Sequence, residues 1–420
     1  MRGGRYVLLL FIFFLIMINY CDRVALSVGS KAIADEFHLS PVQMGYLLSS
    51  FSWTYVIFLI PWGVAVDRLG PRIVTMVGTG LWSVATVISG FVFNLPSLLA
   101  ARLLMGGSEA SAFPAAGRLI RSWVPPSQFG FASMMAISGG YAGPAVGAIV
   151  FGWLASAFGW RAGFVIVGCS GFIWILLAFF WFHKPGDAPG QAAGSKEAVG
   201  SIGGFGQILA SPVLWGLFLT QGACVYSHNL HVTWLPNYLQ TTRHLSMMMT
   251  GLLTGLPFAL SVIGSLAISL LSDRILGKAG DSTGKRRWMV AAMMVLSASI
   301  VLVPFVDNLW VILAIFTLAL TGTSASTGLN GALLTDMLAS PSDAGKAHAV
   351  LTVGGNIFGT LAPIVTGYVV ANTGTFDATW YFCGTLLIAG ALIVSVTRGA
   401  IGIPQDSDRD AIPQPVQASP

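Results

Sequence analysis

Four ionisable side chains stand inside apolar segments that are long enough to cross a membrane. Asp22 and Arg23 follow the apolar run 6–18, and Arg102 and Glu109 share a later segment. A charge in a spanning helix is costly and usually faces the bundle interior or a water-filled path. The four formal charges cancel, which favours a shared interior site.

The spacing of these residues suggests what they do together. Arg23 and Arg102 each lie about seven residues from the same predicted side, roughly 10 Å below that surface, and Glu109 lies two turns further along the helical face of Arg102. An Arg binds a carboxylate bidentately and keeps its charge. We therefore hypothesise that an Arg captures an anion while Asp22 and Glu109 carry protons. Alternatively, the four form ion pairs that only compensate one another.

The composition requires a membrane to surround these helices. The chain is 55% hydrophobic and 9% charged, with a mean hydropathy of +0.77, whereas soluble domains carry about 25% charged residues. Apolar runs of about 20 residues, the length that crosses a bilayer, recur along it. They predict an all-α protein with twelve spans, near 5–30, 42–66, 72–93, 95–119, 129–156, 162–182, 212–239, 247–272, 288–305, 309–335, 345–371 and 376–398.

The spans fall into two groups of six. We expect an N-terminal bundle at 1–183, a flexible linker at 184–210, a C-terminal bundle at 211–398 and a disordered tail at 399–420. The segments on one side hold most of the Lys and Arg, and those on the other hold only Lys31, Arg161 and Arg243. This excess indicates that both termini face the cytoplasm. The short loops favour a bacterial-type inner (cytoplasmic) membrane.

The two groups resemble each other at an offset of 206 residues. The shift places Asp67-Arg68 on Asp273-Arg274 and residues 20–23 on residues 226–229. Two parallel halves related by an axis along the membrane normal are a transporter architecture, with the binding site near the midplane between them.

Several segments carry a resemblance to a known family. Gly63–Arg72 (GVAVDRLGPR) resembles the signature between helices two and three of the major facilitator superfamily. Asn19–Arg23, Gly106–Ala110 and Phe113–Ala115 resemble its anion:cation symporter branch, which includes bacterial sugar-acid transporters and sialin. The resemblance implies the twelve-helix major facilitator fold and proton-coupled uptake of a small organic anion, such as a sugar acid, by alternating access. It implies protons as the coupling ion, no cofactor, no nucleic-acid partner and a monomer.

The resemblance also implies residue roles. Arg23 would bind substrate, Arg102 would organise the charge network, and Asp22 with Glu109 would couple protons. Further substrate contacts would come from Tyr20, Tyr55, Asn330 and Asn356. Tyr and Asn in membrane helices also bond neighbouring helices, so packing is the alternative.

A second set of charges lies at the predicted cytoplasmic ends of the helices. The resemblance implies that these residues latch the two halves in one conformational state, with an Asp carboxylate bonding a helix N-terminus. The alternative is that they only set the topology. The set comprises Asp67, Arg68, Arg72, Asp273 and Arg274.

His228 and His231 stand at the repeat position of Asp22 and Arg23. They lie on one side of a helix, but two histidines without acids or cysteines are a weak metal signal. We expect packing or hydrogen bonding, with substrate contact or titration by His228 as the alternative. The four cysteines have no metal spacing and are expected to be small core residues.

Other functions fit the sequence less well. A proton-driven antiporter or exporter of a cationic or drug-like compound would use buried acids without a paired Arg. A channel would need a continuous polar pore, and a receptor a signalling domain. An enzyme would need a nucleophile, base and orienting group, and no such set is visible, so we expect no catalytic residues.

Overall fold

The fold is seen in a computed structural model, which describes residues 2–125, 128–181, 205–276, 282–340 and 343–401. These residues are almost wholly helical, and a single β-bridge within them pairs Leu338 with Ile401. The N-terminal half contains α1 (Arg2–Phe37), α2 (Pro41–Leu69), α3 (Pro71–Ser89), α4 (Leu95–Glu109), α5 (Ala112–Trp123) and α6 (Phe129–Trp181). The C-terminal half contains α7 (Phe205–Leu209), α8 (Pro212–Thr241), α9 (Met247–Leu276), α10 (Ser282–Ser297), the 3-10 segment η2 (Ala298–Phe305), α11 (Leu309–Asp336), α12 (Ala344–Thr373) and α13 (Asp377–Val396).

These helices form twelve crossing segments, as predicted. Helix α6 is long enough to cross twice, and Gly159 divides it because its φ of 83° lies in the left-handed region, which favours glycine. Helices α4 and α5 together make one crossing that is interrupted at Ala110 and Ser111, and α10 continues into η2. The predicted spans therefore agree with the observed helices.

Local sequence sets where the helices begin. Ser40 and Asn94 cap α2 and α4, each accepting a hydrogen bond from the backbone amide three residues later. Pro41 and Pro71 stand at the first position of α2 and α3, where a missing amide proton costs nothing. Gly70 has a φ of 83° and makes the tight turn between α2 and α3.

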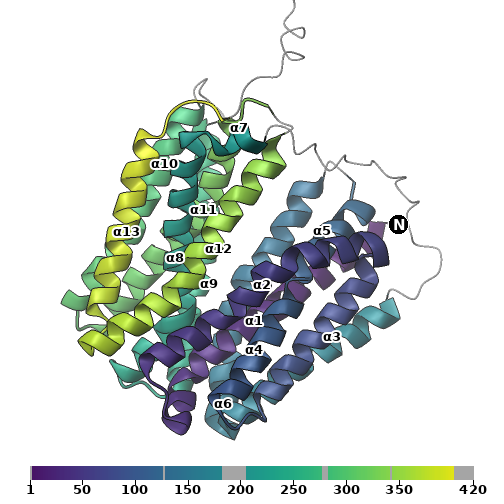
Figure 1. Ribbon diagram of the computed structural model, residues 1–420, viewed down its shortest axis with the longest axis vertical. Helices are drawn as coiled ribbons and strands as arrows, with labels where there is room; N and C mark the ends of the chain where they lie inside the picture. Colours follow the sequence, from purple (N-terminus) through teal and green to yellow (C-terminus); the bar gives the residue numbers. More distant parts are fainter. Residues whose placement is uncertain (1, 126–127, 182–204, 277–281, 341–342, 402–420) are drawn as a thin grey trace, which may run out of the picture.

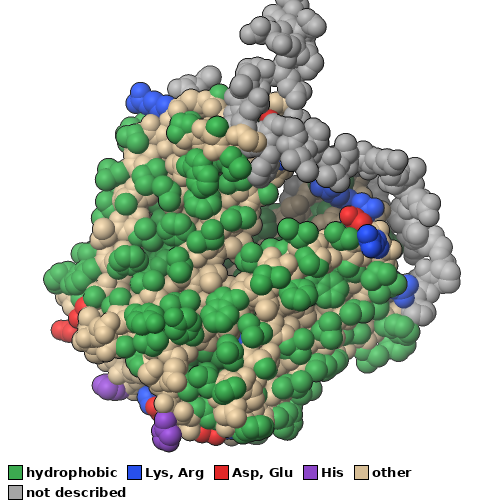
Figure 2. Space-filling model, in the orientation of Figure 1, with side chains coloured by type: hydrophobic (Ala, Val, Ile, Leu, Met, Phe, Trp, Pro, Cys, Tyr) green, Lys and Arg blue, Asp and Glu red, His purple; other side chains and the backbone are tan. Residues whose placement is uncertain are grey.

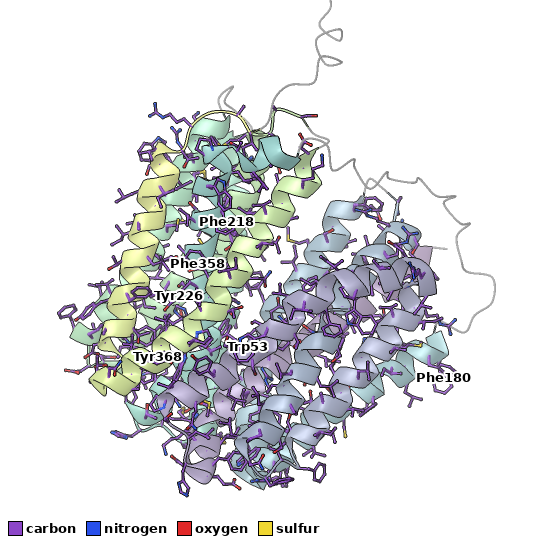
Figure 3. All side chains as sticks on the ribbon, viewed as in Figure 1. Trp53, Phe180, Phe218, Tyr226, Phe358 and Tyr368 are labelled. Carbon is purple, nitrogen blue, oxygen red and sulfur yellow. The ribbon has the colours of Figure 1, made fainter. Side chains whose placement is uncertain are left out.

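Glycines let the helices approach closely, as expected from their abundance. Gly139, Gly143 and Gly147 form a stripe on α6 against α1, and a Cβ at Gly147 would lie 2.6 Å from the Cα of Cys21. In the C-terminal half, Gly222 lies against the ring of Phe358 and Gly354 against that of Phe218 (Figure 3). Small residues of this kind pack membrane helices without a hydrophobic driving force.

The two bundles meet mainly at one end of the molecule. We call the end at which α6 finishes and α8 begins the linker end, and the other the opposite end. The bundles lie side by side and diverge toward the linker end (Figure 1), and the surface is recessed between them there (Figure 2). Among the described residues, the hydrogen bonds between the halves lie between the middle and the opposite end, at Tyr46–Tyr368, Ser49–Thr360, Ser30–Asn237 and Val28–Gln240.

Two glycine contacts close the opposite end. Gly45 on α2 meets Gly367 on α12, and Gly152 on α6 meets Gly251 on α9. A Cβ at Gly45 would lie 2.6 Å from the carbonyl oxygen of Pro363, and one at Gly152 would lie 2.8 Å from the Cα of Gly251. We call these two contacts the glycine seams. The structure is therefore closed at the opposite end.

Three details differ from the sequence expectation. Helix α1 continues to Phe37 rather than to residue 30. The short helix α7 lies within the range 184–210 assigned to a flexible linker, of which residues 184–204 are outside the described part. Ile401, within the range 399–420 expected to be disordered, is buried and exchanges backbone hydrogen bonds with Met337 and Ala339; residues 402–420 lie outside the described part.

The outer surface is consistent with a bilayer. Hydrophobic side chains cover the sides of the molecule, and charged side chains gather near its ends (Figure 2). Nine described helices are long and apolar enough to cross a membrane by length and composition. The remaining crossings come from the second part of α6, from α8, and from α4 with α5. The protein is a multi-pass membrane protein.

Candidate functional site

Arg23 lies at the centre of a polar cluster in the N-terminal half. Its Nε donates to Oε2 of Glu109 at 2.8 Å, and its Nη2 donates to Oδ1 of Asn19 at 2.8 Å. The side chain of Arg23 is 16% exposed, whereas that of Glu109 is 0% exposed. One edge of the guanidinium is thus held by protein, and part of the group remains accessible to a ligand.

Three aromatic rings surround this guanidinium. Its central carbon lies 4.4 Å from the ring centroid of Tyr20, 4.4 Å from that of Phe51 and 4.9 Å from that of Tyr55. An Arg over an aromatic face is stabilised by about 0.5–2 kcal/mol, more when water is excluded. The rings hold the cation in place while leaving its hydrogen-bond donors available to an anion.

Arg102 shares one of these rings. Its guanidinium carbon lies 5.6 Å from the centroid of Phe51, and Nη1 contacts the sulfur of Met105. Arg23 and Arg102 are therefore at a similar level, as predicted. Helix α1 is longer than predicted, and Arg23 lies roughly 20 Å along the helix axis from its last residue, Phe37.

Asp22 is close to the other three charges but bonded to none of them. It is 1% exposed, and neither carboxyl oxygen has a hydrogen-bond partner in the described part of the protein. Asp22 lies within the electrostatic reach of Glu109, Arg102 and Arg23. Nε of Arg102 and Oε1 of Glu109 are also buried without a partner. The cluster thus holds unused donors and acceptors, and other pairings are available to it.

The local fold explains why Glu109 reaches Arg23. Glu109 is the last residue of α4, directly before the interruption at Ala110 and Ser111. Gly106 and Gly107 bring α4 close to α2, where the indole of Trp62 donates to the carbonyl of Gly107 at 2.7 Å. A negative side chain at a helix C-terminus is unfavourable, so the Arg23 cation compensates it. The helix break and the glycines together place the acid in the cluster.

The C-terminal half contributes His228, which lies at the boundary of the halves. Its ring meets the ring of Tyr141, on α6, edge-to-face at 6.3 Å, and that of Phe258 at 6.0 Å. His228 is half-buried and within the electrostatic reach of Arg23. Tyr141 is also half-buried and close to Tyr20. The cluster around Arg23 therefore continues across the interface to α8.

The two predicted asparagines are placed differently. Asn330 on α11 is fully buried and donates to the carbonyl of Leu217 and the side chain of Gln221, each at 3.1 Å. Asn356 on α12 is half-buried and donates to the carbonyl of Thr352 at 3.0 Å. Asn330 is engaged within its own half, whereas Asn356 lies one turn from Thr360, which accepts from Ser49 across the interface.

The predicted latch residues lie at the linker end, where the bundles diverge. Asp67 and Arg68 are exposed and Arg72 is half-buried. Within the described residues, no ion pair joins Asp67 or Arg68 to the C-terminal half. Asp273 and Arg274 belong to the last turn of α9, but their side chains are outside the described part. The latch stays a prediction for the state in which this end closes.

The remaining candidates have structural surroundings. His231 is fully buried, its Nδ1 lies 2.6 Å from the carbonyl oxygen of Ser227, and its ring packs on Phe316. No group of three metal-ligating side chains occurs among the described residues. Cys224 and Cys383 are buried, Cys21 is half-buried and Cys169 is exposed, and all four are free thiols; Cys169 therefore differs from the expected core position.

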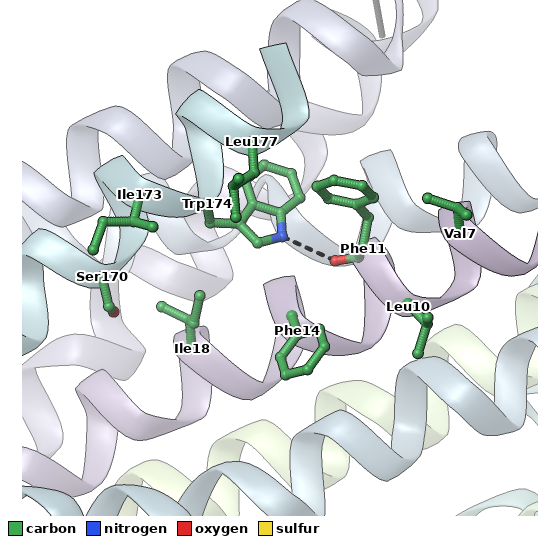
Figure 4. Close-up of a pocket in the computed structure, with 9 residues that line it drawn as sticks. All are labelled: Val7, Leu10, Phe11, Phe14, Ile18, Ser170, Ile173, Trp174 and Leu177. Carbon is green, nitrogen blue, oxygen red and sulfur yellow. Dashed lines mark hydrogen bonds between the residues drawn. The ribbon is translucent and has the colours of Figure 1, made fainter. Parts of the chain in front are cut away.

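A separate cavity of 390 Å³ lies on the flank of the molecule between α1 and α6 (Figure 4). Its lining is apolar except for Ser170, whose hydroxyl already donates to the carbonyl of Val167, and the indole of Trp174, which donates to the carbonyl of Phe11 at 3.0 Å. Phe14 and Leu177 on its rim are exposed. Such a groove suits hydrocarbon rather than an anion.

Sequence reasoning missed three members of the cluster. Asn19 lies one helical turn before Arg23, and this spacing was a signal that the side chains would meet. Phe51 and Tyr141 carried no such signal, because aromatic residues are common in apolar helices. Only the packing of α2 and α6 against α1 brings their rings to the cluster.

The fold and the interior charges define a membrane transporter, and the comparisons with known proteins identify its family. The chain matches the model of the Major Facilitator Superfamily at residues 12–279 and 275–418. Because this match covers most of its length, the protein belongs to that superfamily.

Curated relatives include sugar-acid transporters, consistent with the branch that the resemblance indicated. The chain is 30% identical to the probable galactarate/D-glucarate transporter GudP of Bacillus subtilis, over 94% of this chain and 92% of the relative. It is 28% identical to the D-galactonate transporter of Escherichia coli O6:H1, over 92% of this chain and 94% of that transporter. It is 29% identical to the probable sulfoacetate transporter SauU of Cupriavidus necator, over 89% of each.

A solved structure supports the same fold. A bacterial homolog of the human lysosomal transporter Spinster, in an inward-facing and unoccupied conformation, superposes with a TM-score of 0.75 at 19% identity. The superposition covers 94% of this chain and 96% of that one. The likeness extends over both six-helix bundles.

Proposed function

We propose that the protein carries a small organic anion, a sugar acid, into the cell together with protons. The observation that carries this proposal is the partly exposed Arg23, held by Glu109 on one side and ringed by aromatic side chains. An anionic ligand needs such a fixed cation. The names of the relatives, which include galactarate, glucarate and galactonate transporters, support the substrate class.

The geometry suggests how protons and anion are coupled. Glu109 is the anionic partner of Arg23, and a substrate carboxylate would compete with it for the guanidinium. A proton on Glu109 would weaken the ion pair and free Arg23 for the substrate. Asp22, buried without donors, suits a neutral acid, because an ionised carboxylate in that position would be costly. The two acids would therefore be loaded with protons when the anion binds and would release them with it.

The charge asymmetry supports an orientation of the protein in the membrane. Lys and Arg gather near the linker end, and an excess on one side marks the cytoplasmic face. The open linker end would then face the cytoplasm, and the glycine seams would close the outside. Alternating access would open the seams and close the linker end, where Asp67 and Arg68 are free to approach the other half.

The test is uptake into proteoliposomes that contain the purified protein. Labelled galactonate or galactarate should accumulate inside when the outside is made more acidic than the inside. An ionophore that collapses the pH gradient should abolish the accumulation. Uptake that is indifferent to the gradient would disprove proton coupling, and uptake of neither acid would disprove the substrate class.

A further inference from the structure

The relatives' names leave open whether the substrate carries one carboxylate or two. Galactarate and glucarate are dicarboxylates, whereas galactonate is a monocarboxylate with a hydroxyl at the other end. The two classes need different groups at the far side of the site. We call far side the place where the ring of Tyr141 on α6 meets that of His228 on α8, on the side of Tyr20 away from Arg23 along the chain of contacts Arg23–Tyr20–Tyr141–His228.

The far side contains neutral hydrogen-bonding groups. His228 is half-buried, and none of the hydrogen bonds within the described part of the protein involves its ring nitrogens. The hydroxyl of Tyr141 lies beside the side chain of Ser324 on α11. A neutral imidazole and a phenol each donate and accept hydrogen bonds. Together they match the hydroxyl groups of a sugar chain.

Among the described side chains, no second permanent cation lies on the far side. The described lysine and arginine side chains of the C-terminal half all lie within two turns of a helix end or between helices, at Arg243, Lys285, Arg286, Arg287, Lys346 and Arg398. Arg102 is 2% exposed and cannot contact a ligand in this state. A second carboxylate would therefore enter a buried place without a fixed positive partner, which is costly.

We propose that Tyr141 and His228 determine specificity by binding the uncharged, hydroxylated end of a monocarboxylate. The inference rests on the proposed function and adds the substrate class: an aldonate is preferred to the corresponding aldarate. The chain Arg23–Tyr20–Tyr141–His228 spans the two halves, and Gly140 lets α6 approach Tyr20, where a Cβ would lie 3.3 Å from its ring. The ligand thus bridges the halves that move against each other.

Galactonate and galactarate are matched probes, because they differ only in the group at one end, a primary alcohol or a carboxylate. Binding of each is measured by thermal stabilisation of the purified full-length protein at pH 7, where both carboxyl groups of galactarate are ionised. We expect galactonate to stabilise the protein at a concentration at least tenfold lower. Equal potency, or a preference for galactarate, overturns the inference and leaves the proposed function intact. If neither acid binds, the proposed function fails as well.

Variants test the two residues directly. His228→Arg supplies the missing cation and should shift the preference toward galactarate at least tenfold, whereas His348→Arg, at the linker end, should leave the ratio unchanged. Tyr141→Phe keeps the ring and removes the hydroxyl, so galactonate should bind several-fold more weakly at unchanged stability of the free protein. If both His228→Arg and Tyr141→Phe keep the wild-type ratio and affinities, the assignment is wrong.

Discussion

Helices α1 and α8 occupy corresponding places in the two halves, yet their interiors carry different chemistry. In the N-terminal half, Arg23 is bonded to Glu109 at 2.8 Å, with Asp22 beside them. In the C-terminal half, the polar groups inside the bundle are neutral: Ser227 lies 3.4 Å from Thr323, and the ring of His231 meets the backbone of Ser227. One half therefore holds the charges, and the other is held together by hydroxyl and backbone hydrogen bonds.

The closing surfaces, in contrast, are alike in the two halves. The α2–α12 seam and the α6–α9 seam each place one glycine from each half in backbone contact. The comparison teaches that the repeat has been kept where the halves move against each other and has diverged where the substrate and protons would bind. The substitutions below test this division of roles between the charged interior of the N-terminal half, the neutral interior of the C-terminal half and the seams that the two halves share.

The largest effect is expected for Arg23→Ala. It leaves Glu109 buried without a partner, which costs about 3–5 kcal/mol, and it removes the cation that would hold the substrate. Initial uptake of labelled galactonate should fall at least about 100-fold, because a loss of about 1.4 kcal/mol in binding free energy corresponds to a tenfold change in affinity. Lys31→Ala is the control and should change uptake less than about twofold, as expected for its exposed ion pair with Asp35. Arg23→Ala protein that elutes as folded and still transports would refute the division.

A smaller effect is expected for Glu109→Gln, which keeps the shape but cannot release a proton. Moving one proton down a pH difference of one unit releases about 1.36 kcal/mol. Symport with one proton can therefore concentrate the substrate about tenfold for each unit of pH difference across the membrane. The variant should lose this accumulation while it still exchanges internal for external substrate. The control is His231→Gln, a change inside the neutral half, which should retain accumulation. Uphill uptake by Glu109→Gln would remove its role in coupling.

Substitution in the seams should have an intermediate effect that is the same on both sides. Gly45→Val and Gly152→Val each force a side chain into a backbone contact, and overpacking costs about 1–3 kcal/mol. Either variant should favour the state with the opposite end open and reduce uptake about fivefold or more. A cysteine introduced at Asn237, which bonds Ser30 across the halves, should then react faster with a water-soluble maleimide. Unequal effects would show that the seams are not equivalent.

The smallest effect is expected at the linker end. Asp67→Asn removes a carboxylate that would bond a helix N-terminus in the other state, an interaction of about 0.3–1 kcal/mol. Turnover should change about two- to fivefold, with Asp273→Asn behaving similarly because the sequence repeats there. Kinetics unaltered in both variants would leave topology as the role of these charges.

Much of the architecture followed from the sequence because lipid imposes strict rules on it. The apolar runs gave the twelve crossings, since every backbone group in a bilayer must be bonded within a helix. Asp22, Arg23, Arg102 and Glu109 were identified for the same reason, as charges in lipid are rarely kept without a function. The end of the first helix was misplaced because the charged residues Lys31, Asp35 and Glu36 concealed the continuation of α1 to Phe37.

The sequence by itself thus determined the fold class, the family and the charged residues of the interior, because hydropathy and charge are properties of each residue. The tertiary structure decided which charges pair, which rings surround Arg23, and that Tyr141 of one half meets His228 of the other. These contacts depend on how helices far apart in the chain approach one another. The helix break after Glu109 and the glycines of α4 and α6 set that approach, and neither follows from hydrophobic pattern alone.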